Sequence, residues 1–208
     1  MIKSAKPNLL SLHSKSNLIL QNSCGSCCIT KHNVGKLILP TGRIVMCSPD
    51  NEYAHIDDYS RLAFAVSVPR GEYPVTLYVS NFDNGKELAF AEICFRDTIP
   101  ISYSEASTQK DIELKRKGYK GYVVNDDRTG LMDAEAFYHV SSQRTVIDYE
   151  EDDSFIEDEE IQSGLCNIIS TPNNALLLSV RSGVYYWYWG KDKDKNICNL
   201  VGDFFSFN

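Results

Sequence analysis

The chain has 208 residues, of which 43% are hydrophobic and 24% charged, and this composition suits one globular domain while excluding collagen-like, coiled-coil and wholly disordered chains. No apolar run approaches the roughly 18 residues of a membrane-spanning helix, so no membrane partner is expected. The net charge of −7 argues against a broad basic face for phosphates, and we expect no direct nucleic-acid binding.

Short apolar or alternating runs separated by turn signals predict roughly a dozen strands. The expected strands cover 17–21, 36–39, 43–47, 62–68, 73–80, 87–95, 121–124, 166–170, 175–180, 184–189, 196–201 and 204–207. This spacing predicts a mainly β, β-rich α+β fold with an antiparallel sandwich or barrel-like sheets and two or three short helices.

Three turn signals lie between these strands. Pro40-Thr-Gly42 is interpreted as a hairpin turn between 36–39 and 43–47, and Pro69-Arg-Gly71 as a turn before 73–80. Asp83-Asn-Gly85 is typical of a type I′ hairpin.

Helical patterns occur in three places. The segment 104–117 has acids early, bases late and Gly118 as a stop, which suits a helix dipole and C-cap. The segment 133–142 is expected to be a helix with Asp133 as its N-cap. The segment 149–162 is either a helix or a solvated loop.

The excess of acidic over basic residues lies in segment 149–162. It holds eight of the 28 acids and no Lys or Arg, and without it 20 acids face 21 bases. These acids are Glu150, Glu151, Asp152, Asp153, Glu157, Asp158, Glu159 and Glu160. We therefore expect a single domain, 1–208, with residues 1–34 as an N-terminal extension packed on it and 149–162 as an exposed acidic segment.

Seven cysteines indicate free thiols in a reducing compartment, and the N-terminus lacks the apolar core of a secretory signal, so a cytoplasmic location is expected. Cys24-Gly-Ser-Cys27-Cys28 has the spacing of a metal knuckle or redox motif. Because no second pair of cysteines accompanies it, we interpret these as small buried or turn residues and expect no metal and no cofactor.

The run Asp192-Lys-Asp194-Lys-Asn196, with Asp203 further on, imitates the ligand spacing of a calcium loop. Its sixth position is Ile197 where a calcium loop needs glycine. A charged hairpin loop is therefore the preferred interpretation.

Five consecutive aromatic residues run from Tyr185 to Trp189. On a strand, Tyr185, Trp187 and Trp189 face one side while Tyr186 and Tyr188 face the other. Burial on both faces is the preferred interpretation, and a ligand-binding platform and a protein interface are the alternatives.

The usual signatures of nucleophilic, metal-dependent and nucleotide-binding enzymes do not occur in the sequence. Asp126, Asp127 and Asp133 are the acids to examine for a general acid or base, with turn and cap roles as the alternative. No catalytic residue is assigned, and the enzyme question is left open with a preference for a non-enzyme.

Several short motifs occur in a fixed order along the chain. They are Gly42-Arg-Ile-Val45, Val68-Pro-Arg-Gly71-Glu-Tyr-Pro-Val75, Leu88-Ala-Phe-Ala-Glu92, Gly121-Tyr122, Thr129-Gly-Leu-Met-Asp133-Ala-Glu-Ala136, Ser182-Gly-Val-Tyr185, Tyr188-Trp189-Gly190, Asp192 and Asp203-Phe204. In order and spacing, this set resembles the bacterial domain-of-unknown-function family 4241 over roughly residues 35–208. The resemblance implies a single, mainly antiparallel β domain with short helices. The chain departs from the family at Arg181-Ser-Gly183 and at Asn125, where members tend to carry an Asp.

Two functions from different classes follow. The first is a non-catalytic binding protein that neutralises a basic protein partner, such as a toxin-immunity protein or another inhibitor, through the acidic segment. The second is a small-ligand-binding or hydrolytic β domain whose pocket is lined by Asp126, Asp133, Tyr185, Trp187, Trp189 and Asp203. The two hypotheses differ in whether these acids meet in one cleft.

Overall fold

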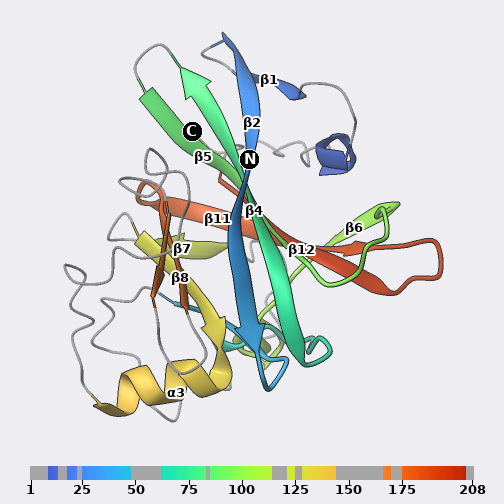
Figure 1. The fold of residues 1–208 in the computed structure, drawn as a ribbon. Helices are drawn as coiled ribbons and strands as arrows, with labels where there is room; N and C mark the ends of the chain where they lie inside the picture. Colours follow the sequence, from blue (N-terminus) through green and yellow to red (C-terminus); the bar gives the residue numbers. More distant parts are fainter. Residues whose placement is uncertain are drawn as a thin grey trace.

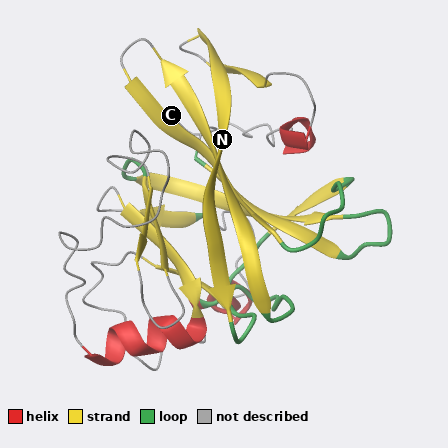
Figure 2. Cartoon of the chain, in the orientation of Figure 1, coloured by secondary structure: helices red, strands yellow, loops and turns green. Residues whose placement is uncertain are grey.

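The computed structural model describes residues 9–13, 18–22, 25–47, 62–82, 85–113, 121–124, 128–143, 166–169 and 175–204. Within these residues the chain forms two antiparallel sheets with one turn of 3-10 helix and two short α-helices (Figures 1 and 2). The predicted mainly β class is therefore confirmed. Among the same residues, no helix has the length and apolarity needed to cross a membrane.

The larger sheet has eight strands. Its order is β1 (Leu18–Asn22), β2 (Gly25–Leu39), β4 (Gly71–Phe82), β5 (Gly85–Cys94), β12 (Ile197–Asp203), β11 (Gly183–Lys191) and β6 (Ser102–Glu105), with β7 (Tyr122–Val124) beside β11. Figure 1 shows that β2 and β4 cross β11 and β12 at a steep angle, so the sheet is strongly twisted. The hairpin at 83–84 is confirmed by the register Phe82↔Gly85.

The smaller sheet has four strands, in the order β3 (Ile44–Cys47), β8 (Arg128–Asp133), β10 (Ala175–Ser179) and β9 (Cys166–Ile169). Helix α3 (Ala134–Gln143), which the sequence predicted over 133–142, follows β8, a strand that it did not predict, and lies at the end of this sheet in Figure 1. Its Ala136 and Phe137 are buried with Val45 and Met132 of the sheet.

Apolar side chains form three clusters. The largest lies between the sheets and includes Leu39, Ile93, Leu131, Leu176 and Leu200, all 2% exposed or less. A second, the outer cluster, lies on the opposite face of the eight-stranded sheet, under the 3-10 helix η1 (Leu9–His13), and the third lies around α3. The eight-stranded sheet is therefore buried on both faces where β5, β12 and β11 run.

Strand β11 carries the five aromatic residues, and their burial on both faces is confirmed. Tyr185, Trp187 and Trp189 belong to the core between the sheets, and Tyr186 and Tyr188 belong to the outer cluster. Each is 9% exposed or less. The other interpretations, a platform and an exposed interface, do not fit this burial.

The helix expected over 104–117 is wrong in its first part. Ser104 and Glu105 belong to β6 and pair with Trp189 and Tyr188, and α2 is described over Gln109–Glu113, while residues 114–117 lie outside the described part. The helix begins after Thr108, whose hydroxyl accepts from the Asp111 amide at 3.2 Å while the Asp111 carboxylate accepts from the Thr108 amide at 3.1 Å. This reciprocal capping box fixes the start of the helix.

Three further expectations differ from the structure. Pro40–Gly42 does form a turn, with the Gly42 amide donating to Leu39 at 3.2 Å, but it joins strands of different sheets and is no hairpin. The segment 62–68 is no regular strand, since only the isolated bridges of Ala63 and Phe64 occur there. Within the expected N-terminal extension, residues 28–33 pair with β4 as part of β2. The expected strand 204–207 does not continue β12 beyond Asp203, and residues 205–207 lie outside the described part.

Truncation of Trp187 tests the two-faced burial of β11. The indole packs edge-on against Phe64 and Phe204 and covers Gly202. We expect Trp187→Ala to lower the free energy of unfolding by about 3–5 kcal/mol in denaturant titration. The control is Val123→Ala, since Val123 is 57% exposed and should change stability by less than about 0.5 kcal/mol. Equal effects of the two substitutions would contradict the assignment.

Candidate functional site

The pocket expected from the sequence is not assembled by the described residues. Trp187 and Trp189 face the core between the sheets. Asp203 pairs with Tyr186 in register, so strand alternation places its side chain on the opposite face, beside Tyr188. Asp126, Asp127 and all eight acids of segment 149–162 lie outside the described residues.

Asp133 is the N-cap of α3, as the sequence predicted. Its carboxylate accepts from the Glu135 amide at 2.9 Å and from the Thr41 amide at 3.1 Å, and the Thr41 hydroxyl also donates to it. The residue is fully buried. Its carboxylate thus joins the turn between the sheets to the start of α3, which is the cap role.

The loop at 192–196 is the charged hairpin that the sequence favoured. Asp192 Oδ1 accepts from the amides of Asp194 and Asn196, both at 2.9 Å. Burial acts to raise the pKa of Asp192, but these hydrogen bonds from Asn196 and Asp194 outweigh it and hold the pKa below its ordinary value. Asp203 pairs with Phe90 and Tyr186 at the other end of β12, so it does not join this loop.

The cysteines show no paired arrangement where they are described. Cys27 and Cys28 lie in β2, and Cys28 is exposed, so the interpretation as buried or turn residues is wrong for it. Cys28, Cys94, Cys166 and Cys198 are free thiols. The described residues hold no group of three or more metal-ligating side chains, and Cys24 lies outside them.

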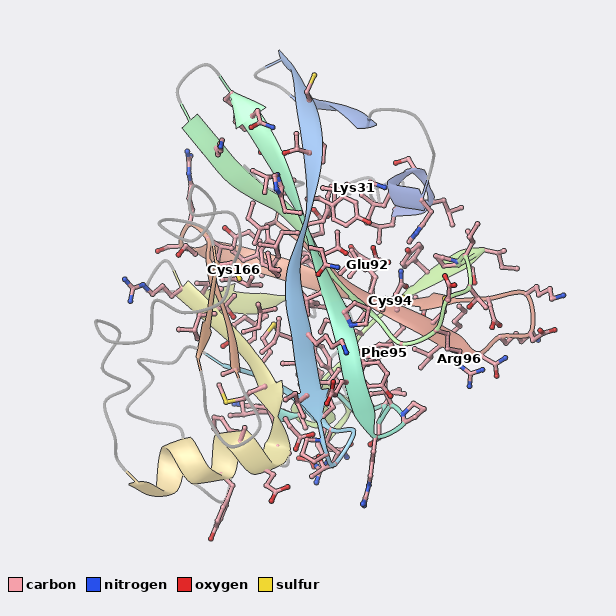
Figure 3. All side chains as sticks on the ribbon, viewed as in Figure 1. Lys31, Glu92, Cys94, Phe95, Arg96 and Cys166 are labelled. Carbon is pink, nitrogen blue, oxygen red and sulfur yellow. The ribbon has the colours of Figure 1, made fainter. Side chains whose placement is uncertain are left out.

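A polar cluster lies on the outer face of the eight-stranded sheet. It contains Tyr78 of β4, Glu92 of β5, Asn199 of β12, Tyr103 of β6 and His13 of η1, and we call it the Glu92 cluster. Figure 3 shows Glu92 near the middle of the sheet and Lys31 on the side of η1. Four strands and the N-terminal helix therefore meet at one buried carboxylate.

Glu92 is 7% exposed and accepts two short hydrogen bonds. Tyr78 Oη donates to its Oε2 at 2.5 Å, and Asn199 Nδ2 donates to its Oε1 at 2.5 Å. His13 Nε2 lies 3.6 Å from Oε1. A buried carboxylate costs much free energy unless it is hydrogen-bonded, so these two donors stabilise its position.

Counting hydrogens assigns the protonation of the cluster. The two amide hydrogens of Asn199 are directed to Glu92 and, at 3.1 Å, to Tyr103 Oη. The hydroxyl hydrogen of Tyr103 is then available for His13 Nε2, which lies 2.9 Å away. We assign Nε2 as the acceptor, so that the neutral ring carries its hydrogen on Nδ1; the opposite tautomer would direct two donors to the Tyr103 oxygen.

The electrostatics agree with a neutral His13. Burial lowers the pKa of His13 below its ordinary value of 6.5; Glu92 acts against this shift and Lys31 adds to it. Burial also raises the pKa of Tyr78 and Tyr103, so both hydroxyls keep their protons as donors. The cluster thus offers a fixed O–H donor to an unprotonated ring nitrogen.

Gly190 is required beside this cluster. It pairs with Asn199, whose Oδ1 has no hydrogen-bond partner. A Cβ at Gly190 would stand 1.8 Å from that oxygen and 3.0 Å from Tyr103 Cε1. No side chain fits there without moving both residues.

Helix η1 is held on the cluster by a few contacts. Leu9 and Leu12 are 3% and 1% exposed within the outer cluster. Lys31 Nζ donates to the Leu12 carbonyl at 2.6 Å and lies 5.3 Å from the centre of the Tyr78 ring. These contacts place His13 over Tyr103 and Glu92.

No motif in the sequence assigns these residues to a site. Glu92 appeared only as the end of a motif, although a lone acid among Ala89, Phe90, Ala91 and Ile93 was a signal of a buried charge. Asn199 gave the same signal between Cys198 and Leu200. His13 and Asn199 are 186 residues apart in the sequence. No local pattern can therefore show that these side chains meet.

The chain matches the family model described as protein of unknown function (DUF4241) over residues 37–202, and it therefore belongs to this family. No curated protein and no solved structure matches the chain. Several family motifs from the sequence are explained by the fold. Gly42 has a φ of 73°, and a Cβ there would stand 2.1 Å from the Val68 carbonyl oxygen, so the first two motifs meet at this glycine.

The neutral state of His13 gives a pH dependence. In the unfolded chain His13 takes up its proton near its ordinary pKa, and in the folded chain it does so only at lower pH. The stability that this group contributes is therefore fully present above its ordinary pKa of 6.5 and is lost as pH falls below that value. We expect His13→Gln to reduce the loss of unfolding free energy over this range, measured by denaturant titration. An identical pH dependence of both proteins would contradict the assignment.

A double-mutant cycle tests the close approach of Gly190 and Asn199. We expect Gly190→Ala to destabilise the protein by about 3 kcal/mol because the added methyl group overpacks the buried cluster. In an Asn199→Ala background the opposing oxygen is gone, so the same substitution should cost less. Additive effects of the two substitutions would show that the two residues do not touch.

Proposed function

We propose that the protein is a non-catalytic binding protein that neutralises a basic protein partner, as toxin-immunity proteins and other inhibitors do. The observation that carries this proposal is the concentration of eight acids within 149–162, without which the chain has one more base than acids. Clustered carboxylates accelerate association with a basic surface and complement its charge.

The acidic segment is attached at two well-packed points. Before it stands α3, fixed by the Asp133 cap and by buried Ala136 and Phe137. After it begins β9, where Cys166 is buried and pairs with Leu178. Both points belong to the part of the molecule around the smaller sheet, away from η1 and the Glu92 cluster.

A binding role agrees with the use of the described acids. Asp133 caps a helix, Asp192 orders a hairpin loop, and Glu92 is held by two donors within the sheet. Each of these carboxylates has a role in holding the fold. The competing hypothesis is a hydrolase in which aspartates converge on one pocket. Asp133 caps α3 beside the smaller sheet, whereas Asp203 lies on the outer face of the larger sheet, so a binding role is better supported.

We place this function in the bacterial cytoplasm. The basis is the set of seven cysteines, of which the four with described thiols are free.

The test compares two variants that each lose four negative charges. The first replaces Glu150, Glu151, Asp152 and Asp153 by Gln or Asn. The matched control replaces exposed acids elsewhere, namely Asp97, Glu113, Glu135 and Asp194. We expect slower association of the first variant, but not of the control, with a lysine-rich peptide and with any basic protein captured from the native host.

The salt dependence of the association rate shows whether charge attraction brings the two proteins together. Exposed charges are screened over about 8–10 Å at physiological ionic strength, so association of the unmodified chain should slow steeply as salt rises. Thermal stability of the first variant should be unchanged or slightly higher, because repulsion among neighbouring acids is relieved. Equal binding by both variants and no salt dependence would refute the proposal.

A further inference from the structure

We propose that Glu92, Tyr103 and Asn199 form a binding pocket for an unprotonated nitrogen heterocycle, of which imidazole is the simplest, and that His13 fills this pocket from within the same chain. The proposal concerns the outer face of the eight-stranded sheet and does not depend on the acidic segment.

The pocket and its occupant belong to different parts of the chain. Tyr78, Glu92, Tyr103 and Asn199 all lie within the family match at 37–202. His13 lies before it, as does Lys31, which holds η1 through the Leu12 carbonyl. The family domain therefore supplies the buried polar groups, and a segment outside the family match supplies the ring that meets them.

The polar groups are ordered independently of His13. Glu92 is held by Tyr78 and Asn199 at 2.5 Å each, and Asn199 also donates to Tyr103 at 3.1 Å. These three bonds link β4, β5, β12 and β6 of one sheet. With His13 removed, the Tyr103 hydroxyl would still be aimed at the place of the ring nitrogen, at the end of a prearranged chain of donors.

The surroundings select an unprotonated ring. The Tyr103 hydroxyl lies 2.9 Å from Nε2 and is assigned as the donor, and the Asn199 amide nitrogen lies 3.4 Å from the same atom. The positive charge of Lys31 disfavours a second positive charge on the ring. Glu92, whose Oε1 lies 3.6 Å from Nε2, acts in the opposite direction and favours protonation. A neutral heterocycle can accept a hydrogen bond from the Tyr103 hydroxyl through its unprotonated nitrogen. A cationic ring would instead have to donate its N–H to the Tyr103 oxygen.

The occupant is a short segment. Helix η1 has five residues, and its contacts include two buried leucines, the Lys31 bond and the His13 bond. Such a short segment opens at lower free energy than the sheet that it covers. His13 thus acts as an internal ligand that competes with an external one.

Free imidazole is the probe for the pocket. His13→Ala keeps the full chain and removes only the ring. At pH 8, imidazole at about ten times its dissociation constant should raise the ratio of folded to unfolded His13→Ala protein about 11-fold. This corresponds to a rise in melting temperature of about 3–6 °C. The unmodified protein should show no rise, because its own ring occupies the pocket.

Three controls make the result specific. Leu10→Ala truncates an exposed side chain of the same helix and leaves the ring and its anchors in place, so imidazole should not stabilise it. Tyr103→Phe combined with His13→Ala removes the donor and should abolish the rise. At about pH 5.5 imidazole is mostly protonated, and the rise should shrink.

Three outcomes would overturn the proposal. Two are a folded His13→Ala protein that imidazole does not stabilise and a Leu10→Ala protein that it stabilises equally. The third comes from the unmodified chain and holds even if His13→Ala does not fold. A long-range ¹H–¹⁵N spectrum at pH 8 should show His13 Nε2 without a proton, and a protonated Nε2 would refute the pocket's selectivity.

Discussion

Burial of β11 on both faces is the constraint on which the rest of this structure depends. Its odd-numbered aromatics, Tyr185, Trp187 and Trp189, fill the space between the sheets, and Tyr186 and Tyr188 fill the outer cluster. A strand of this kind needs neighbours on both edges and cover on both faces. Strands β12, β6 and β7 supply the edges, while the four-stranded sheet and η1 supply the cover.

The outer face adds a second constraint, because it buries a carboxylate among apolar neighbours. Glu92 is tolerated there since Tyr78 and Asn199 satisfy both of its oxygens. The donors come from strands on either side of β5, so the network fixes the sheet register as well as the charge. Gly190 belongs to the same arrangement, because its missing side chain leaves room for Asn199.

The two proposed interactions use separate parts of the sequence and opposite chemistry. The acidic segment follows α3 along the chain, and its role rests on charge at a distance. The Glu92 cluster lies under η1 on the larger sheet, and its role rests on short, directed hydrogen bonds. One can therefore fail experimentally without affecting the other.

The sequence by itself determined the β class, most strands, the α3 cap at Asp133, the charged hairpin at 192–196 and the double burial of the aromatic strand. Each follows from a local signal, namely two-residue alternation, a capping residue or a turn. Pairing partners were decided only by the tertiary structure: Pro40–Gly42 joins two sheets instead of closing a hairpin, and 102–105 is a strand because β11 has an open edge beside it. The Glu92 cluster likewise had no local signature, because His13, Glu92 and Asn199 meet only when the sheet and η1 are assembled.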